Sequence, residues 1–129
     1  MAARPSPAGA EIRVGVVGVG ALGQHHARVY AALPGARLAG VYDIDRSRAA
    51  EVAGKHGGRV FEHLRDLLAE VDAVSVAVPT VDHHRVARVL LDAGKDVLVE
   101  KPMTTTVGEA EDLIRVAAER KAILQVGHI

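Results

Sequence analysis

The sequence contains no cysteine and no tryptophan, and its 129 residues include only two tyrosines and one phenylalanine. Without cysteine, this chain has no disulfide bond, no thiolate nucleophile and no sulfur-ligated metal. So few aromatic rings leave no platform on which the bases of a nucleic acid could stack. Because hydrophobic residues still make up 49% of the chain, we predict a core of aliphatic side chains and alanine.

An excess of charge and a long apolar run are also missing. The 16 basic and 16 acidic residues cancel, so there is no basic field for nucleic acid. No apolar stretch approaches the length of a membrane span, and Met1–Ala10 lacks the apolar core of a signal peptide. We therefore expect a cytoplasmic protein without nucleic-acid or membrane partners. It would have a disordered tail over residues 1–11 and one domain over residues 12–129.

A glycine-rich loop between a buried strand and a helix is the most informative feature. The β-branched run Ile12–Val17 predicts the strand, and G-V-G-A-L-G follows it. In this pattern Gly18 permits a tight turn, Gly20 lets a pyrophosphate approach the backbone, and Gly23 lets the helix pack close to the strand. A structural turn with an empty pocket is the alternative interpretation.

The helix after the loop is predicted over Ala21–Leu33, before Pro34-Gly35. Its first amides, those of Ala21 and Leu22, would face the phosphates together with the positive end of the helix dipole. We expect its core contacts to be Leu22, Val29, Tyr30 and Leu33.

The second strand, predicted over Leu38–Tyr42, ends at Asp43, twenty residues after Gly23. A carboxylate there can accept hydrogen bonds from both ribose hydroxyls of the adenosine half of a dinucleotide. It would repel a 2′-phosphate, so NAD is favoured over NADP. Arg46 and Arg48 complicate this prediction because either could reach a phosphate, although both fit a solvated helix face. Arg46 could also stack on the adenine.

The rest of the chain alternates strands and helices. Further helices are predicted over Arg46–Lys55, His63–Glu70, Asp82–Ala93 and from the Thr106–Glu109 capping box, and strands over Arg59–Phe61, Ala73–Val78, Val97–Val99 and Ile123–Val126. The inward positions of the last two helices are expected at Val86, Val89, Leu90, Ala93, Ala110, Leu113, Ile114 and Ala117.

Connections of this length force parallel pairing and right-handed crossovers. We therefore predict an α/β fold, a doubly wound Rossmann sheet of six parallel strands in the order 3-2-1-4-5-6. The ligand crevice would lie at the carboxyl ends of strands one and four. Val78, Pro79 and Thr80 would line it opposite the glycine loop.

Glu100-Lys101-Pro102 follows the fifth strand directly, at the ligand edge of the sheet; alone, such a tripeptide also fits a solvated surface. It occurs together with P-T-V-D-H at residues 79–83, A-G-K-D-V-L-V-E-K-P at residues 93–102 and G-Q-H-H-A at residues 23–27. With these motifs, residues 12–129 resemble the Gfo/Idh/MocA family of glucose–fructose oxidoreductases and inositol dehydrogenases. The ending Q-V-G-H-I is similar to the branch acting on nucleotide-linked amino sugars, such as UDP-N-acetylglucosamine 3-dehydrogenases.

The resemblance implies an NAD(P)-dependent dehydrogenase that moves a hydride between nicotinamide C4 and a carbon of a sugar, nucleotide-sugar or cyclitol. In that family the lysine of the Glu-Lys-Pro motif contacts substrate and the nicotinamide ribose. This implies that Lys101 is catalytic and stabilises developing alkoxide charge. Glu100 and His83 are carried over as cofactor-site residues, with Glu100 orienting the loop.

Family members also have a second domain, which carries most of the substrate pocket and the catalytic histidine and which has no counterpart in this chain. We therefore expect the isolated chain to bind NAD weakly and to be inactive on sugars. Whether it forms a homo-oligomer stays open.

Two histidine pairs, His25-His26 and His83-His84, raise the alternative of a metal site. Adjacent residues of a helix diverge by about 100°, so each pair offers one ligand at most. We therefore predict no metal, and we expect a structural or pocket-lining role for His26 and His83. His128 would lie near the substrate site.

Two other functions stay open. Dinucleotide-binding folds also serve non-catalytic NAD sensors and scaffolds, and other two-domain reductases, acting on dipeptide precursors or bile pigments, share such a domain. Lys101 would distinguish an enzyme from a sensor, and the Glu-Lys-Pro context argues against the other reductases.

Overall fold

The computed structural model describes residues 11–127. In chain order its elements are β1 (Ile12–Val17), α1 (Ala21–Ala32), β2 (Ala36–Tyr42), α2 (Arg46–His56), β3 (Arg59–Val60), the 3₁₀ helix η1 (Leu64–Ala69), β4 (Ala73–Val76), the 3₁₀ turn η2 (Thr80–Asp82), α3 (His83–Asp92), β5 (Asp96–Glu100), α4 (Val107–Arg120) and β6 (Leu124–Gly127). The predicted tail, up to residue 10, and His128 lie outside the described residues.

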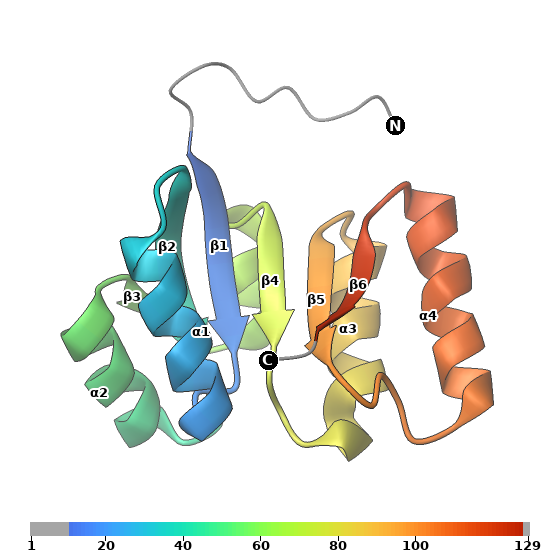
Figure 1. Ribbon diagram of the computed structural model, residues 1–129, viewed down its shortest axis with the longest axis horizontal. Helices are drawn as coiled ribbons and strands as arrows, with labels where there is room; N and C mark the ends of the chain where they lie inside the picture. Colours follow the sequence, from blue (N-terminus) through green and yellow to red (C-terminus); the bar gives the residue numbers. More distant parts are fainter. Residues whose placement is uncertain (1–10, 128–129) are drawn as a thin grey trace.

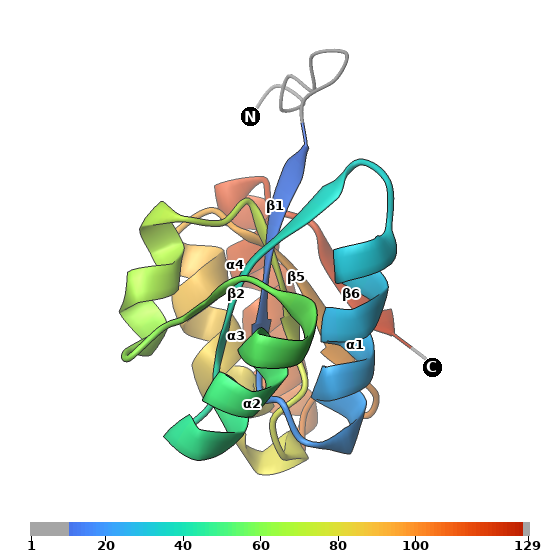
Figure 2. The same ribbon diagram turned by 90° about the vertical axis from the view of Figure 1, so that its left-hand side faces the viewer.

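The six strands form one parallel sheet in the order β3-β2-β1-β4-β5-β6, which confirms the predicted topology. Helices α1 and α2 lie on one face, and η1, α3 and α4 on the other (Figures 1 and 2). The carboxyl ends of β1 and β4 are neighbours, and α1 and α3 both begin at this edge (Figure 1). This edge is where a doubly wound sheet binds its ligands.

The core consists of two aliphatic layers, as the composition predicts. The larger layer lies between the sheet and η1, α3 and α4, where Phe61 is the largest fully buried side chain. The smaller layer lies between the sheet and α1 and α2, and is built around Val16, Val41 and Val52. The sheet is therefore anchored on both faces at the strands that carry the crevice.

The expected inward face of α1 is wrong in three of four positions. Leu22, Val29 and Leu33 are 39–48% exposed, whereas Tyr30 packs against the core. The buried residues of α1 are Gly23, which packs against the backbone of Gly18 directly after β1, and the positions three and four residues later, His26 and Ala27. His26 thus lies in the core, whereas the hydrophobic pattern of α1 predicted leucine and valine side chains there.

Smaller differences concern the later elements. Ile114 and Val89, which were expected to face inward, are 55% and 38% exposed. Leu91 of α3 and Val116 of α4 are buried in their place. Residues 64–69 form a 3₁₀ helix rather than an α-helix. Strand β4 ends at Val76, so the predicted strand residue Val78 belongs to the loop that lines the crevice.

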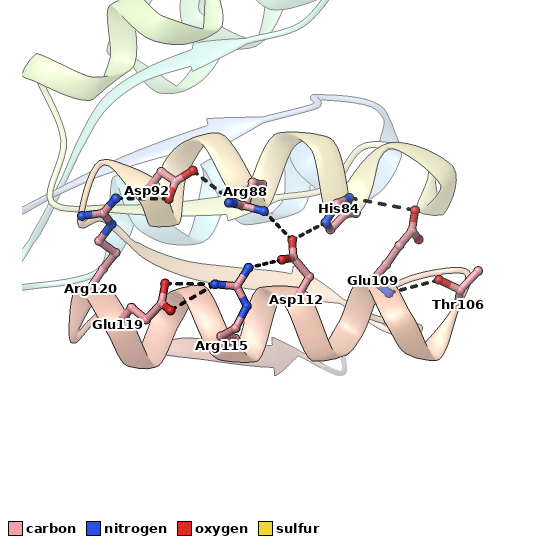
Figure 3. Close-up of polar contacts among 9 residues, drawn as sticks. All are labelled: His84, Arg88, Asp92, Thr106, Glu109, Asp112, Arg115, Glu119 and Arg120. Atoms are coloured by element: carbon pink, nitrogen blue, oxygen red, sulfur yellow. Dashed lines mark hydrogen bonds and ion pairs between the residues drawn. The ribbon is translucent and has the colours of Figure 1, made fainter.

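A network of ion pairs joins α3 to α4 on the outer surface (Figure 3). Its centre is Asp112, which accepts hydrogen bonds from His84 and Arg88 of α3, both at 2.7 Å, and from Arg115 of its own helix at 2.6 Å. The hydrogen bond from His84, followed by those from Arg115 and Arg88, lowers the pKa of Asp112 to about 2. The ionised carboxylate is therefore the form that the folded state prefers.

We expect Asp112→Asn to lower the free energy of unfolding at neutral pH. Because the folded pKa lies below the unfolded value, the contribution of the carboxylate is complete above about pH 5 and is lost as the pH falls from about 4 to about 2. Urea titrations at several pH values should show the gap between wild type and variant closing over that range. Glu111→Gln, on the exposed side of the same helix, is the control, and an equal gap at pH 7 and pH 3 would contradict the assignment.

Candidate functional site

The glycine loop makes two close contacts that other residues could not make. Gly18 has a φ of +88°, and a Cβ there would lie 2.8 Å from the backbone of Ala77 and Val78. A Cβ on Gly23 would lie 1.7 Å from the carbonyl oxygen of Gly18. At Gly20 the nearest atom to such a Cβ is a guanidinium nitrogen of Arg48 at 3.8 Å. Gly18 and Gly23 are thus required by packing, whereas Gly20 keeps space open.

Helix α1 begins directly after this loop with no side chain capping it. Gly20 is the N-cap residue, and the first turn holds no acidic residue. The first amides of an α-helix have no partner within the helix, and here they lie at the positive end of the helix dipole. This edge of the sheet can therefore bind an anionic group through backbone N–H groups.

Asp43 is held in one orientation beside the loop. Its side chain is 8% exposed, and Oδ2 accepts a hydrogen bond from the N–H of Val19 at 2.8 Å. Oδ1 accepts from the N–H of Asp45, also at 2.8 Å, and Nη1 of Arg48 lies 3.8 Å from Oδ2. The carboxylate thus joins the end of β2 to the glycine loop.

A cleft of about 490 Å³ opens between these elements and the loop after β4. The structure brings seven of the predicted site residues to its wall: Gly18, Gly20, Ala21, Leu22, Asp43, Val78 and Pro79. The other predicted residues lie outside the set that lines it: Gly23, Arg46, Thr80, His83, Glu100 and Lys101. Gly23 is packed beneath the loop, and Lys101 is exposed at the end of β5.

Of the two arginines weighed for the adenosine end, Arg48 lines the cleft. Arg46 points away and pairs with Glu62 at 3.4 Å. Side chains two positions apart on a helix point about 200° apart, and Arg48 lies on the side of α2 that lines the cleft. The N–H of Arg48 also donates to the capping side chain of Asp45. The cleft also contains Ile44 and Leu64, which the sequence analysis did not single out. A capping aspartate three residues before an arginine was the available signal for Arg48.

Lys101 stands between two residues that hydrogen bonds hold in place. Glu100, 8% exposed, accepts from His26 at 3.1 Å, and the N–H of Lys101 donates to the Gly127 carbonyl at 3.3 Å. On the other side, His83 contacts the carbonyl oxygens of Pro102 and Met103. The backbone that carries Lys101 is therefore tied to both neighbouring layers.

The histidines of the two pairs, His25-His26 and His83-His84, contact protein groups. His26 contacts Ser75 and Glu100, His84 contacts Asp112, and His25 contacts Arg28. Within residues 11–127, no three His, Asp or Glu side chains converge as metal ligands. In the same part of the chain, no helix combines the length and hydropathy that a membrane crossing needs.

Comparison with known proteins shows which family this chain resembles. The family described as "Oxidoreductase family, NAD-binding Rossmann fold" (GFO_IDH_MocA) matches residues 12–128. The chain is 50% identical to a UDP-N-acetylglucosamine 3-dehydrogenase of Acidithiobacillus ferrooxidans over 92% of its length and 37% of the relative's. It is 42% identical to an inositol 2-dehydrogenase of Saccharopolyspora erythraea over 90% of its length and 36% of the relative's. The chain thus spans about a third of the length of these curated relatives.

Comparison with solved structures also finds similar proteins. The crystal structure of the Acidithiobacillus ferrooxidans enzyme superposes with a TM-score of 0.88 at 49% identity, covering 92% of this chain and 38% of that one. GenD2 from gentamicin A biosynthesis, solved in complex with NAD, also superposes with a TM-score of 0.88, at 38% identity, covering 92% of this chain and 34% of that one.

The two kinds of loop glycine should respond differently to alanine. We expect Gly23→Ala to lower the free energy of unfolding by about 3 kcal/mol or more, at the upper end of overpacking costs, because its Cβ meets backbone. Gly20→Ala should change it by about 1 kcal/mol or less, the cost of a poorer N-cap, since φ is −67° and the site is open. Urea denaturation of both variants checks this, and equal losses would show that Gly20 is also required by packing.

Proposed function

The chain belongs to the Gfo/Idh/MocA oxidoreductase family, and on this premise we propose that it is the nucleotide-binding part of a longer dehydrogenase of the cytoplasm. That enzyme transfers a hydride between a nicotinamide cofactor and a sugar, nucleotide-sugar or cyclitol. The observation that carries the proposal is the Asp43 carboxylate, which a loop amide holds beside the uncapped start of α1. Anion-binding amides and a ribose acceptor stand at one edge of one cleft.

The described cleft would hold the adenosine half of the cofactor. The amides at the start of α1 would bind the pyrophosphate, and Gly20 would let it approach the backbone. Asp43 would accept hydrogen bonds from the ribose hydroxyls. Ile44 and Pro79 both line the cleft and would offer apolar contact to the adenine ring.

Chemistry would occur at the other end, near Lys101. The cofactor, when bound, supplies the nicotinamide C4 that accepts or returns the hydride. Lys101 is exposed at the ligand edge of β5, where its ammonium can donate a hydrogen bond to the reacting oxygen of the substrate. A donor already aimed at an oxygen that gains negative charge lowers the barrier. The rest of the substrate pocket would belong to the part of the enzyme beyond this chain.

We further propose NAD rather than NADP as the cofactor. The Asp43 carboxylate would lie against a 2′-phosphate, and two like charges in a partly buried site repel each other. Arg48, 3.8 Å from that carboxylate, compensates part of this charge and is the group that could accept NADP at lower affinity. The NAD complex of GenD2, a similar structure, supports this choice.

Calorimetric titration of the 129-residue protein with NAD⁺ should give saturable, weak binding, with NADP⁺ weaker still. We expect Asp43→Asn to reduce NAD⁺ affinity about tenfold through lost charge-assisted hydrogen bonds, and to narrow the preference over NADP⁺. The asparagine oxygen can still accept from the Val19 N–H, which keeps the contact with the glycine loop, whereas the hydrogen bond from the Asp45 N–H is lost. Gly20→Ala should abolish binding because its Cβ fills the phosphate position.

The two arginines give a matched pair for the same titration. Arg48→Ala should weaken NADP⁺ further, whereas Arg46→Ala, whose side chain pairs with Glu62 outside the cleft, should leave both affinities within about twofold. If folded wild-type protein shows no saturation at millimolar NAD⁺ or NADH, the proposed function is wrong.

Lys101 distinguishes the enzyme from the NAD sensor considered above. In the longer protein, assayed with UDP-N-acetylglucosamine and with myo-inositol, Lys101→Met should lower kcat by about a hundredfold or more with NAD affinity changed much less. Lys95→Met, at the opposite end of β5, is the control. A variant with normal kcat on an active substrate would favour the sensor.

A further inference from the structure

A buried chain of hydrogen bonds links α1 to the residue before Lys101. Nε2 of His26 lies 3.1 Å from Oε1 of Glu100, and Nδ1 lies 3.1 Å from Oγ of Ser75, which also bonds the hydroxyl of Tyr30. His26, Ser75 and Glu100 are 5, 0 and 8% exposed. Tyr30 can donate to Ser75, Ser75 to Nδ1, and Nε2–H to the carboxylate, so that each group has a partner.

Ser75, His26 and Glu100 stand in the order of a nucleophile, base and acid. Hydrolytic chemistry does not fit them, because Ser75 is fully buried in β4 and its hydroxyl is already shared with Tyr30. Such a buried polar network contributes less to stability than apolar packing of the same volume would, but it fixes the orientation of the side chains that it joins. The oriented group here is Glu100, whose backbone continues into Lys101.

His83 holds the other side of Lys101. It is 2% exposed at the start of α3, and Nδ1 lies 3.2 and 3.1 Å from the carbonyl oxygens of Pro102 and Met103. Nε2 lies 2.9 Å from the carbonyl oxygen of Val78, a wall residue of the cleft. One ring thus joins the loop after β5 to the loop after β4.

The two histidines act from opposite faces of the sheet, since α1 and α3 cover different faces (Figure 2). We propose that His26 and His83 are positioning residues, which hold Glu100 on one side and Pro102–Met103 on the other and thereby aim Lys101 at the nicotinamide end of the cofactor. The inference rests on the proposed role of Lys101. It adds that this role depends on two side chains that touch neither cofactor nor substrate.

Asparagine and glutamine separate the two nitrogens of each ring, because the amide nitrogen of asparagine falls near Nδ1 and that of glutamine near Nε2. The proposal needs the tautomer of His83 that carries its proton on Nδ1, which donates to the loop carbonyls. His83→Asn should keep a donor at these carbonyls, and His83→Gln should place its donor near the Val78 carbonyl instead. Conversely, His26→Gln should keep the bond to Glu100, and His26→Asn only the contact with Ser75. Within each pair, the variants remove the same ring and differ in the bond they leave.

The first measurement uses ¹⁵N relaxation of the free 129-residue protein and needs no cofactor. Wild type should give order parameters near about 0.85 at the amides of Lys101, Met103 and Thr104. His83→Gln and His26→Asn should lower these values toward about 0.6 while β1 stays rigid, and His83→Asn and His26→Gln should retain them. Equal values within each pair would overturn the proposal, because a merely structural ring would not distinguish its two sides.

The second measurement compares NAD⁺ with ADP, which lacks the nicotinamide riboside. His83→Gln and His26→Asn should lower the affinity for NAD⁺ about fivefold, which corresponds to part of the contribution of one hydrogen bond to a charged group. The affinity for ADP should stay within about twofold of the wild-type value. A loss shared equally by both ligands would mean general destabilisation and would refute positioning. If NAD⁺ fails to bind wild type, the proposed function fails, whereas the relaxation result still decides whether the histidines order the loop.

Should a His26 variant not fold, Glu100 provides the same test from the other partner. Glu100→Gln keeps an oxygen that can accept from Nε2–H of His26, and Glu100→Leu removes it. The glutamine variant should keep the order of Lys101 and the leucine variant should lose it. Retained order in Glu100→Leu would overturn the His26 half of the proposal.

Discussion

The close approach of α1 to the end of β1 at Gly23 is the constraint on which the site depends. No side chain fits between this residue and the carbonyl oxygen of Gly18, so the helix starts almost in contact with the strand. The first helical amides stay uncapped at this edge because the N-cap residue, Gly20, has no side chain. The contact at Gly23 also sets the rotation of α1, which turns His26 toward the strands and into contact with Glu100, seventy-four residues away in sequence.

The strand, the glycine loop, α1 and the acid at the end of β2 could be predicted because each depends on neighbours in sequence. The prediction of these features rested on spacing: a β-branched run is followed by three glycines, and Asp43 comes twenty residues after the last of them. The sheet order followed as well, since parallel strands with helical crossovers have one common handedness and one common arrangement of this size. The family resemblance then pointed to Lys101 as the candidate catalytic residue. No spacing within the chain would have distinguished it from a surface lysine.

Other features depended on long-range packing and could not be predicted from the pattern. Leu22 and His26 both lie on α1, and hydrophobicity alone favours Leu22 as the core residue, whereas the contact at Gly23 makes it the more exposed of the two. Arg46 and Arg48 are two residues apart on α2, so their side chains point to nearly opposite sides of the helix. The packing of α2 through Ala49 and Val52 decides that Arg48 is the one that lines the cleft. The contacts of His83 with loop carbonyls involve residues nineteen and twenty positions later and no recognisable spacing.

The two ends of the proposed cofactor site are therefore built in different ways. At the adenosine end, the anion-binding amides and the Asp43 carboxylate all belong to one β–α–β unit. At the other end, Lys101 is ordered by contacts from α1, α3 and β6, three elements that come together only in the complete sheet. His26 and His83 contact the segment around Lys101 and not the glycine loop. Under the proposed function, affinity for the adenosine half and hydride transfer can therefore vary separately, because separate parts of the fold support them.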